Sequence, residues 1–154
     1  MRTITYLVVF VILQLILFCG PARASEKGRI ETYITKHYGP HKARAMRYVP
    51  MIREESKRQN VDPLLVVIIV HLESSSKHGA VSKVGACGLM QIKPCRSRPP
   101  RLNVRRGIKV LKREVKRCGS LLNGLNAYQS GKCAPVLKRV RFRLWTYRKA
   151  RERK

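Results

Sequence analysis

The sequence predicts a mainly α-helical domain. Residues 41–58 and 103–118 place apolar side chains three and four positions apart with charged side chains between them, which is the pattern of a helix with one buried face. Residues 64–72 are apolar except for His71. A helix that is apolar on every side lies inside a domain, and this one is too short to cross a bilayer. We therefore expect a central buried helix covered by amphipathic ones.

Residues 1–24 form a separate unit at the start of the chain. A basic residue, Arg2, precedes a largely apolar stretch at 6–18, and small residues stand at Ala22 and Ala24. This order predicts a cleaved signal peptide and export to the periplasm or the extracellular space.

Two alternatives remain for this segment. A retained membrane anchor would need about 20 apolar residues, which is more than the stretch offers. Lipid attachment at Cys19 is the other alternative, but the bulky Phe18 stands where a lipoprotein has a small residue.

The rest of the chain divides into three parts. Residues 25–40 are polar and contain two glycines, so we expect a flexible lead-in. Residues 41–137 form the expected catalytic domain, whose first helix contains Pro50 and should be kinked or broken there. Residues 138–154 hold nine Lys or Arg among aromatic and apolar residues. This basic tail is either an amphipathic helix or a disordered arm.

The central helix has a strong start signal. Asp62 can accept hydrogen bonds from the free amides of the first turn, and Pro63 suits the first helical position. The helix should end near Glu73. Residues 74–88 contain three glycines and predict an irregular loop or a small hairpin.

Two further helices are expected after this loop. The segment at 103–118 should stop at Gly119, and a helix at 121–128 should end near Gly131, because glycine readily adopts the left-handed conformation that closes a helix.

Four of the five cysteines lie outside residues 1–24. An even number in an exported chain predicts two disulfide bonds among Cys87, Cys95, Cys118 and Cys133. The pairing stays open, although 87 with 95 and 118 with 133 would each join a local segment. A zinc site is the competing interpretation, but these spacings lack close C-x-x-C pairs. We therefore expect neither a metal nor a cofactor.

The charge of the chain is extreme. It has 34 Lys and Arg against 8 Asp and Glu, a formal net charge of +26, which implies a polyanionic partner and salt-sensitive association. An exported protein meets anionic envelope polymers and lipid head groups first, so no nucleic-acid partner is expected. The basic tail should supply this attachment and should be separable from any activity of the domain.

Glu73 is the candidate catalytic residue. A carboxyl group directly after an apolar helix should be partly buried, and burial disfavours its charged form. A protonated carboxyl is what a general acid for glycosidic bond cleavage requires. The plain alternative is a glutamate at a helix end that faces solvent.

Two sequence blocks carry a resemblance to a known family. Glu73-Ser74, followed by residues 82–94 (SKVGACGLMQIKP), resembles the signature of the soluble lytic transglycosylase (SLT) catalytic domain, a relative of goose-type lysozyme. Residues 126–131 (NAYQSG) resemble the second motif of this family, usually Ala-Tyr-Asn-Ala-Gly, with Gln129-Ser130 as a departure. The resemblance implies an all-α, lysozyme-like fold that cleaves peptidoglycan.

The family resemblance also implies roles for individual residues. Glu73 would protonate the bond between N-acetylmuramic acid and N-acetylglucosamine and then deprotonate the muramic 6-hydroxyl, which closes a 1,6-anhydro ring. Ser82, Gln91 and Tyr128 would line the sugar site, with Met90 packed beneath it. Tyr128 could instead be a core aromatic residue, and Gln91 could serve only as a loop hydrogen-bonding residue.

The acid inventory independently favours a mechanism with one carboxylate. An ordinary glycosidase places two carboxylates around the bond. Asp62 lies about 16 Å from Glu73 along the same helix at 1.5 Å per residue, and Glu114 is expected on a polar helix face between basic residues. Attack by a hydroxyl of the sugar itself needs no second carboxylate.

The sequence thus predicts an exported peptidoglycan lytic transglycosylase. The alternatives are a non-catalytic basic protein of the same fold that binds wall or membrane, and a hydrolytic lysozyme. We expect a monomer that acts on glycan strands, by analogy beside a secretion, conjugation or phage apparatus.

Overall fold

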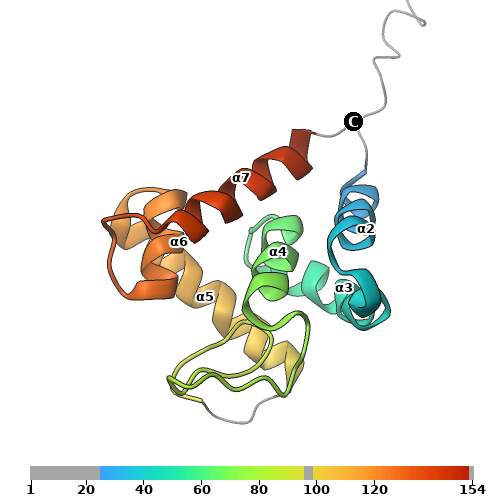
Figure 1. Ribbon diagram of the computed structural model, residues 1–154, viewed down its shortest axis with the longest axis horizontal. Helices are drawn as coiled ribbons and strands as arrows, with labels where there is room; N and C mark the ends of the chain where they lie inside the picture. The colour runs from blue at the N-terminus through green and yellow to red at the C-terminus, as the bar shows by residue number, and fades with distance from the viewer. Residues whose placement is uncertain (1–24, 96–98, 153–154) are drawn as a thin grey trace, which may run out of the picture.

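The computed structural model describes residues 25–95 and 99–152, which form helices joined by short connections and one long loop (Figure 1). The elements are α2 (Glu26–His37), a 3-10 helix η1 (Gly39–His41), α3 (Lys42–Arg58), α4 (Pro63–Ser74), α5 (Pro100–Cys118), α6 (Leu121–Ser130) and α7 (Lys138–Glu152). Within the described residues there is no β-strand, and the long loop holds two isolated antiparallel bridges. The predicted all-α class is confirmed.

Helix α4 lies at the centre of the molecule and packs against α2, α3 and α7 (Figure 1). Its first eight residues are all buried, as its uniformly apolar sequence predicts. Asp62 caps the start, since its Oδ1 accepts a hydrogen bond from the amide of Leu64 at 2.9 Å. Ser75, in the left-handed conformation, ends the helix. Both predicted boundaries are therefore correct within two residues, and Glu73 lies in the last turn.

The predicted flexible lead-in is wrong, because residues 26–37 form helix α2. Ile30 and Ile34 are fully buried and Tyr33 is 3% exposed. These positions lie on one helical face, which packs against α4. Ser25 caps the helix by accepting a hydrogen bond from the amide of Gly28. The polar composition of this segment obscured a short apolar stripe that is enough to anchor a helix on the core.

Helix α3 runs through Pro50 without a break. Pro50 has no backbone N–H to donate, but it is exposed, so the missing hydrogen bond lies on the solvent side of the helix. Ala45, Val49 and Ile52 remain packed in the core. Of the kink or break expected at this proline, the break does not occur.

Helices α5 and α6 pack closely against each other, and α5 also packs against α3 (Figure 1). Gly119 and Gly131 end them with φ of 73° and 76°, as the sequence predicts. Disulfide bonds join Cys87 to Cys95 within the long loop, and Cys118 to the connection after α6 at Cys133. Of the open connectivities, the structure therefore has the two local ones.

The basic tail is helix α7, which packs against α4, α6 and α2. Val140, Leu144 and Tyr147 are buried and share one face of this helix. The Tyr147 hydroxyl donates to Asp62 Oδ2 at 2.9 Å, which ties α7 to the start of α4. Residues 138–152 are therefore part of the core packing rather than a disordered arm.

No helix in the described ranges is long and apolar enough to span a membrane. The predicted signal peptide at residues 1–24 lies outside the described residues.

Candidate active site

Glu73 opens onto a groove of about 800 Å³. The walls come from the end of α4, from the loop at residues 82–93, from one face of α5 and from the end of α6. This arrangement explains why two sequence blocks far apart in the chain share a site. The long loop forms one side of the groove and the second block, on α6, forms the other.

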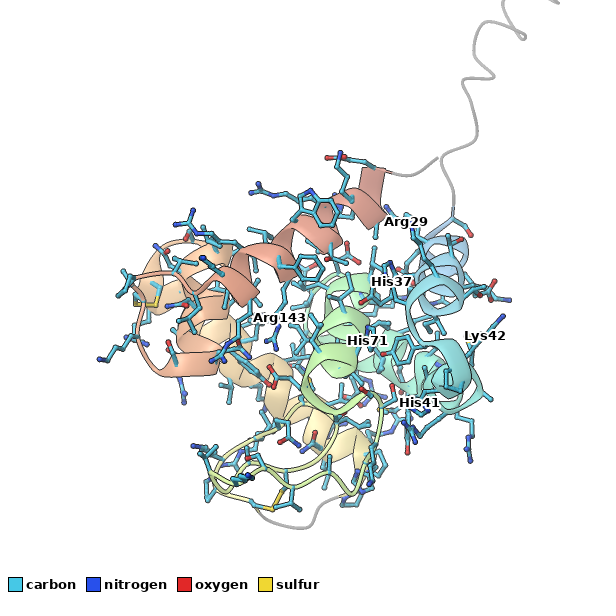
Figure 2. The ribbon with its side chains drawn as sticks, in the orientation of Figure 1. Arg29, His37, His41, Lys42, His71 and Arg143 are labelled. Atoms are coloured by element: carbon cyan, nitrogen blue, oxygen red, sulfur yellow. A yellow bond between two sulfur atoms is a disulfide. The ribbon has the colours of Figure 1, made fainter. Side chains whose placement is uncertain are left out.

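The carboxylate of Glu73 is held by two side chains from the C-terminal part of the chain. Arg143 Nη1 lies 2.8 Å from Glu73 Oε1, and the Gln129 amide donates to the same oxygen at 3.3 Å. The Glu73 and Arg143 side chains are 14% and 10% exposed. Figure 2 shows Arg143 projecting from α7 into the space between α7 and α4. Glu73 is thus partly buried, as predicted, but it is paired with a cation that the sequence analysis did not foresee.

Ser82 and Gln91 both line the groove and also hold the loop in shape. Ser82 Oγ accepts from the amide of Ala86 at 3.0 Å. The Gln91 side-chain amide donates to the carbonyls of Ala80 and Gly88, each at 3.0 Å. The side chains of Ser82 and Gln91 therefore line the groove and also stabilise the loop that forms its wall.

Met90 is fully buried beneath the groove and is not among the residues that line it. Its carbonyl accepts a hydrogen bond from the Tyr128 hydroxyl at 2.5 Å. Tyr128 itself lines the groove. Burial, and secondarily the charge of Glu73, raise the pKa of Tyr128 well above its usual value. Tyr128 therefore remains a neutral hydrogen-bond donor that joins α6 to the loop.

Two close approaches fix the loop against α5. Asn103 accepts from the Met90 amide at 2.9 Å and donates to the Cys87 carbonyl at 3.0 Å. Its side chain occupies the space that a Cβ at Gly88 would need, and Gly88 has a φ of 82°. On the next turn of α5, Gly107 leaves room for the Met90 side chain. These contacts were not predicted.

The position predicted for Glu114 is wrong. It is 6% exposed and lines the same groove as Glu73. Arg113 and Arg117 pair with its two oxygens at 2.8 and 2.7 Å. The hydrogen bond from Arg117 is the main reason that its pKa is lowered. Glu114 is a second carboxylate in the groove, but both of its oxygens are occupied.

His71 lies on the side of α4 that faces α2 (Figure 2). Its Nδ1 is 2.9 Å from the Tyr33 hydroxyl, and its ring stacks on Tyr38 with centroids 4.1 Å apart. Burial, followed by the charge of His37, lowers its pKa. The predicted packing role fits these contacts, and His71 is not among the residues lining the groove.

Sequence reasoning missed Gln129 and Arg143, the two side chains that contact the Glu73 carboxylate. Gln129 was noted only as a departure from the family motif, yet its longer side chain reaches Glu73. Arg143 is one of many basic residues in its segment. Its only local signal is register, since it shares the helical face of Val140, Leu144 and Tyr147, which are all buried.

The model of the transglycosylase SLT domain family matches residues 50–141, a segment that includes Glu73, the groove-forming loop and α6. The chain belongs to this family. The matched segment begins inside α3 and ends within α7, so the SLT domain contains all four walls of the groove.

Several curated proteins resemble parts of this SLT domain. Membrane-bound lytic murein transglycosylase C of Actinobacillus pleuropneumoniae is 38% identical over 74 residues, which are 47% of this chain and 20% of that protein. Endo-type membrane-bound lytic murein transglycosylase A of Klebsiella pneumoniae is 43% identical over 54 residues, 35% of this chain and 27% of that protein. The transglycosylase of Enterobacteria phage PRD1 is 33% identical over 95 residues, 56% of this chain and 36% of that protein. The matches thus cover about a fifth to a third of the relatives' lengths, and no solved structure matches the chain.

Proposed function

We propose that this protein is a peptidoglycan lytic transglycosylase that cleaves the β-1,4 bond between N-acetylmuramic acid and N-acetylglucosamine. The observation that carries the proposal is Glu73, at the end of a buried helix, opening onto a groove that is formed by both family motifs. Family membership and the names of the relatives support the same activity.

In the proposed mechanism Glu73 acts twice. As an acid it gives its proton to the glycosidic oxygen, so that the bond to the muramic C1 breaks and N-acetylglucosamine leaves with a free 4-hydroxyl. As a base it then takes the proton of the muramic 6-hydroxyl, whose oxygen bonds to C1 and closes the 1,6-anhydro ring. The carboxyl group ends protonated as it began, and no water is consumed. An intramolecular hydroxyl can replace a second carboxylate because of its high effective concentration.

Ser82, Gln91 and Tyr128 are proposed to contact the sugars, since all three line the groove. Met90 is proposed to support them from beneath, as its carbonyl accepts the Tyr128 hydrogen bond. We propose no metal and no cofactor for this reaction.

A hydrolytic lysozyme is the second candidate because Glu114 lies in the same groove. A base that activates water must take up a proton. Arg117 and Arg113 pair with the two oxygens of Glu114 and lower its pKa, which makes Glu114 a weaker base and favours the transglycosylase. A non-catalytic wall-binding protein of this fold is a third candidate, and it would have no need of a carboxylate at Glu73.

The proposed place of action is the bacterial envelope. Residues 1–24 are proposed to direct export and to be removed. A role in opening the wall beside a secretion, conjugation or phage apparatus follows by analogy, and the phage PRD1 relative supports the phage alternative.

We further propose that α7 holds the protein on anionic envelope polymers. Lys138, Phe142, Trp145 and Lys149 recur at helical spacing and form the exposed face of α7, which we call the outer face. Phe142 and Trp145 are 58% and 56% exposed, and their rings stack with centroids 5.8 Å apart. Exposed aromatic rings flanked by lysines provide apolar contact and charge attraction on one surface.

Mass spectrometry of the products released from purified sacculi tests the proposed reaction. The wild-type protein should release anhydro-muropeptides and Glu73→Gln should release none, because glutamine cannot donate or accept the proton. Glu114→Gln is the matched control in the same groove and should still give anhydro products.

Reducing-end products from the wild type would instead establish hydrolysis. Loss of cleavage in Glu114→Gln, with its fold intact by circular dichroism, would show that a second carboxylate is required. Release of nothing by the wild type would favour the binding protein.

A further inference from the structure

We infer that Arg143 is a positioning residue for Glu73, supplied to the active site by the C-terminal helix. This inference rests on the proposed function, because it assigns Arg143 a role in the reaction proposed for Glu73. It concerns a side chain that lies outside both sequence motifs of the domain.

Arg143 occupies a position that packing alone would give to an apolar residue. Val140, Leu144 and Tyr147 surround it on the inner face of α7 and are all buried. A buried guanidinium is costly unless it is paired and hydrogen-bonded. Arg143 is only 10% exposed, whereas every other basic side chain in an ion pair of the described residues is at least 37% exposed. Its partner is Glu73, at 2.8 Å.

The contact leaves one oxygen of Glu73 available to substrate. Arg143 and Gln129 both donate to Oε1, and among the described residues no group hydrogen-bonds to Oε2. Glu73 and Gln129 line the groove, while Arg143 does not. The cation therefore holds the carboxylate from behind and does not block the groove. This geometry assigns Oε2 as the oxygen that gives and takes the proton.

A second residue of α7 supports the same arrangement. Arg139 Nε donates to Gln129 Oε1 at 2.9 Å, so the Gln129 amide nitrogen faces Glu73. Glutamine reaches this position where the family commonly has the shorter asparagine. Helix α7 thus orients Glu73 both directly and through Gln129.

The role in the reaction follows from the geometry and charge. A general acid must lie within hydrogen-bond distance of the atom it protonates, and small misplacements of a catalytic group can cost about 100-fold in rate. The guanidinium also complements the negative charge on Glu73 after the proton has left. Without Arg143 only the longer contact from Gln129, at 3.3 Å, would restrain the carboxyl group, and Oε2 would be directed less precisely at the bond.

The test is a steady-state comparison of Arg143→Gln and Arg143→Lys with the wild type on soluble glycan fragments, following anhydro-product release. We expect Arg143→Gln to lower kcat by about 10- to 100-fold, with KM changed less than about twofold. Arg143→Lys retains the charge and should recover part of the loss. Arg141→Gln, an exposed arginine on the same helix, is the matched control and should keep the wild-type kcat.

A stability control separates positioning from folding. Leu144→Ala loosens the packing of α7 but retains the cation, and thermal unfolding of all variants is measured in parallel. A wild-type kcat in Arg143→Gln would overturn the inference. It would also be overturned if Arg143→Gln lost as much kcat as Leu144→Ala at the same thermal stability and Arg143→Lys recovered none of that loss. A kcat above the wild-type value would also overturn it, because the contact would then restrain the acid. An inactive wild-type protein would overturn the proposed function and this inference together, whereas an active wild type with an unaffected Arg143→Gln overturns this inference alone.

Discussion

Glu55 shows how single charged residues hold the helices of this basic protein together. Its side chain is 1% exposed and lies between α3 and α5. Arg105 binds both of its oxygens, at 2.9 and 3.0 Å, and Arg101 donates to Oε1 at 3.1 Å. The hydrogen bond from Arg105 is the largest reason that the pKa of Glu55 is lowered. The two arginines reach solvent with part of their surface, so this pair compensates a buried carboxylate without burying the cations.

We predict that Glu55→Gln lowers the free energy of unfolding by about 1–3 kcal/mol at pH 7, because hydrogen bonds to a buried charge are lost. The lowered pKa also sets a pH dependence. The contribution of Glu55 is complete above the unfolded-state pKa of about 4.5 and is lost as the pH falls through the lower native pKa. Denaturant unfolding between pH 7 and pH 3 measures both effects.

Glu54→Gln is the matched control for this prediction. Glu54 binds the same Arg101 but is 42% exposed, so its substitution should cost less than that of Glu55. Glu114 also has a lowered pKa and should leave a residual acid dependence in Glu55→Gln. An acid dependence identical to that of the wild type would contradict the role assigned to Glu55.

The sequence and the structure assign different roles to helix α7. Taken as a tail, it is a basic segment that could be removed without loss of activity. In the structure it contacts both ends of α4, through Arg143 at Glu73 and through Tyr147 at Asp62. Burial, with the hydrogen bond to Asp62 as the next cause, raises the pKa of Tyr147 to about 12, so this contact persists across the physiological pH range.

Truncation after Pro135 is therefore expected to abolish cleavage of soluble fragments as well as wall binding. The deletion removes Val140 and Leu144, whose burial contributes about 1.5–3 kcal/mol each, from a domain whose total stability is typically about 5–15 kcal/mol. We expect a broad or absent thermal transition and no product release. A truncated protein that unfolds cooperatively and cleaves at the wild-type rate would show that α7 is dispensable.

At the scale of the whole molecule, the sequence has a net charge of +26, and exposed basic residues lie on α2, α3, α5 and α7. Charge alone would attract any anionic polymer from any direction. The outer face of α7 adds the exposed pair Phe142 and Trp145, and it is this combination that should give attachment an orientation. Since α7 is also proposed to position Glu73, attachment and catalysis would share one helix.

We predict that binding of the wild-type protein to sacculi weakens steeply between about 0.1 M and about 1 M salt, where the Debye length falls from about 10 Å to about 3 Å. Lys138→Gln/Lys149→Gln and Phe142→Ser/Trp145→Ser should each weaken binding at low salt in a sedimentation assay. The charge-matched control is Lys109→Gln/Lys116→Gln on α5, where both residues are exposed. Equal weakening by the two lysine pairs would show that binding follows total charge rather than the outer face.

The sequence by itself determined the elements whose signals are local. Asp62 and Pro63 marked the start of α4, and the apolar run that follows them at 64–72 identified the buried helix. Gly119 and Gly131 marked the ends of α5 and α6. These signals are readable because capping and helix termination depend on a few neighbouring residues. The position of Glu73 followed from the same run and from its family motif.

Only the tertiary structure decided which charged residues meet. The chain contains many arginines, and nothing adjacent to Arg143 in sequence distinguishes it from those that face solvent, because its partner lies 70 residues away. Glu114 was misplaced for the same reason, since its burial depends on how α5 packs against α6 and the loop. Helix α2 was missed because three apolar residues become informative only where α4 offers a surface to bury them. Pairing across the fold is a property of packing, and a linear pattern of basic residues does not contain it.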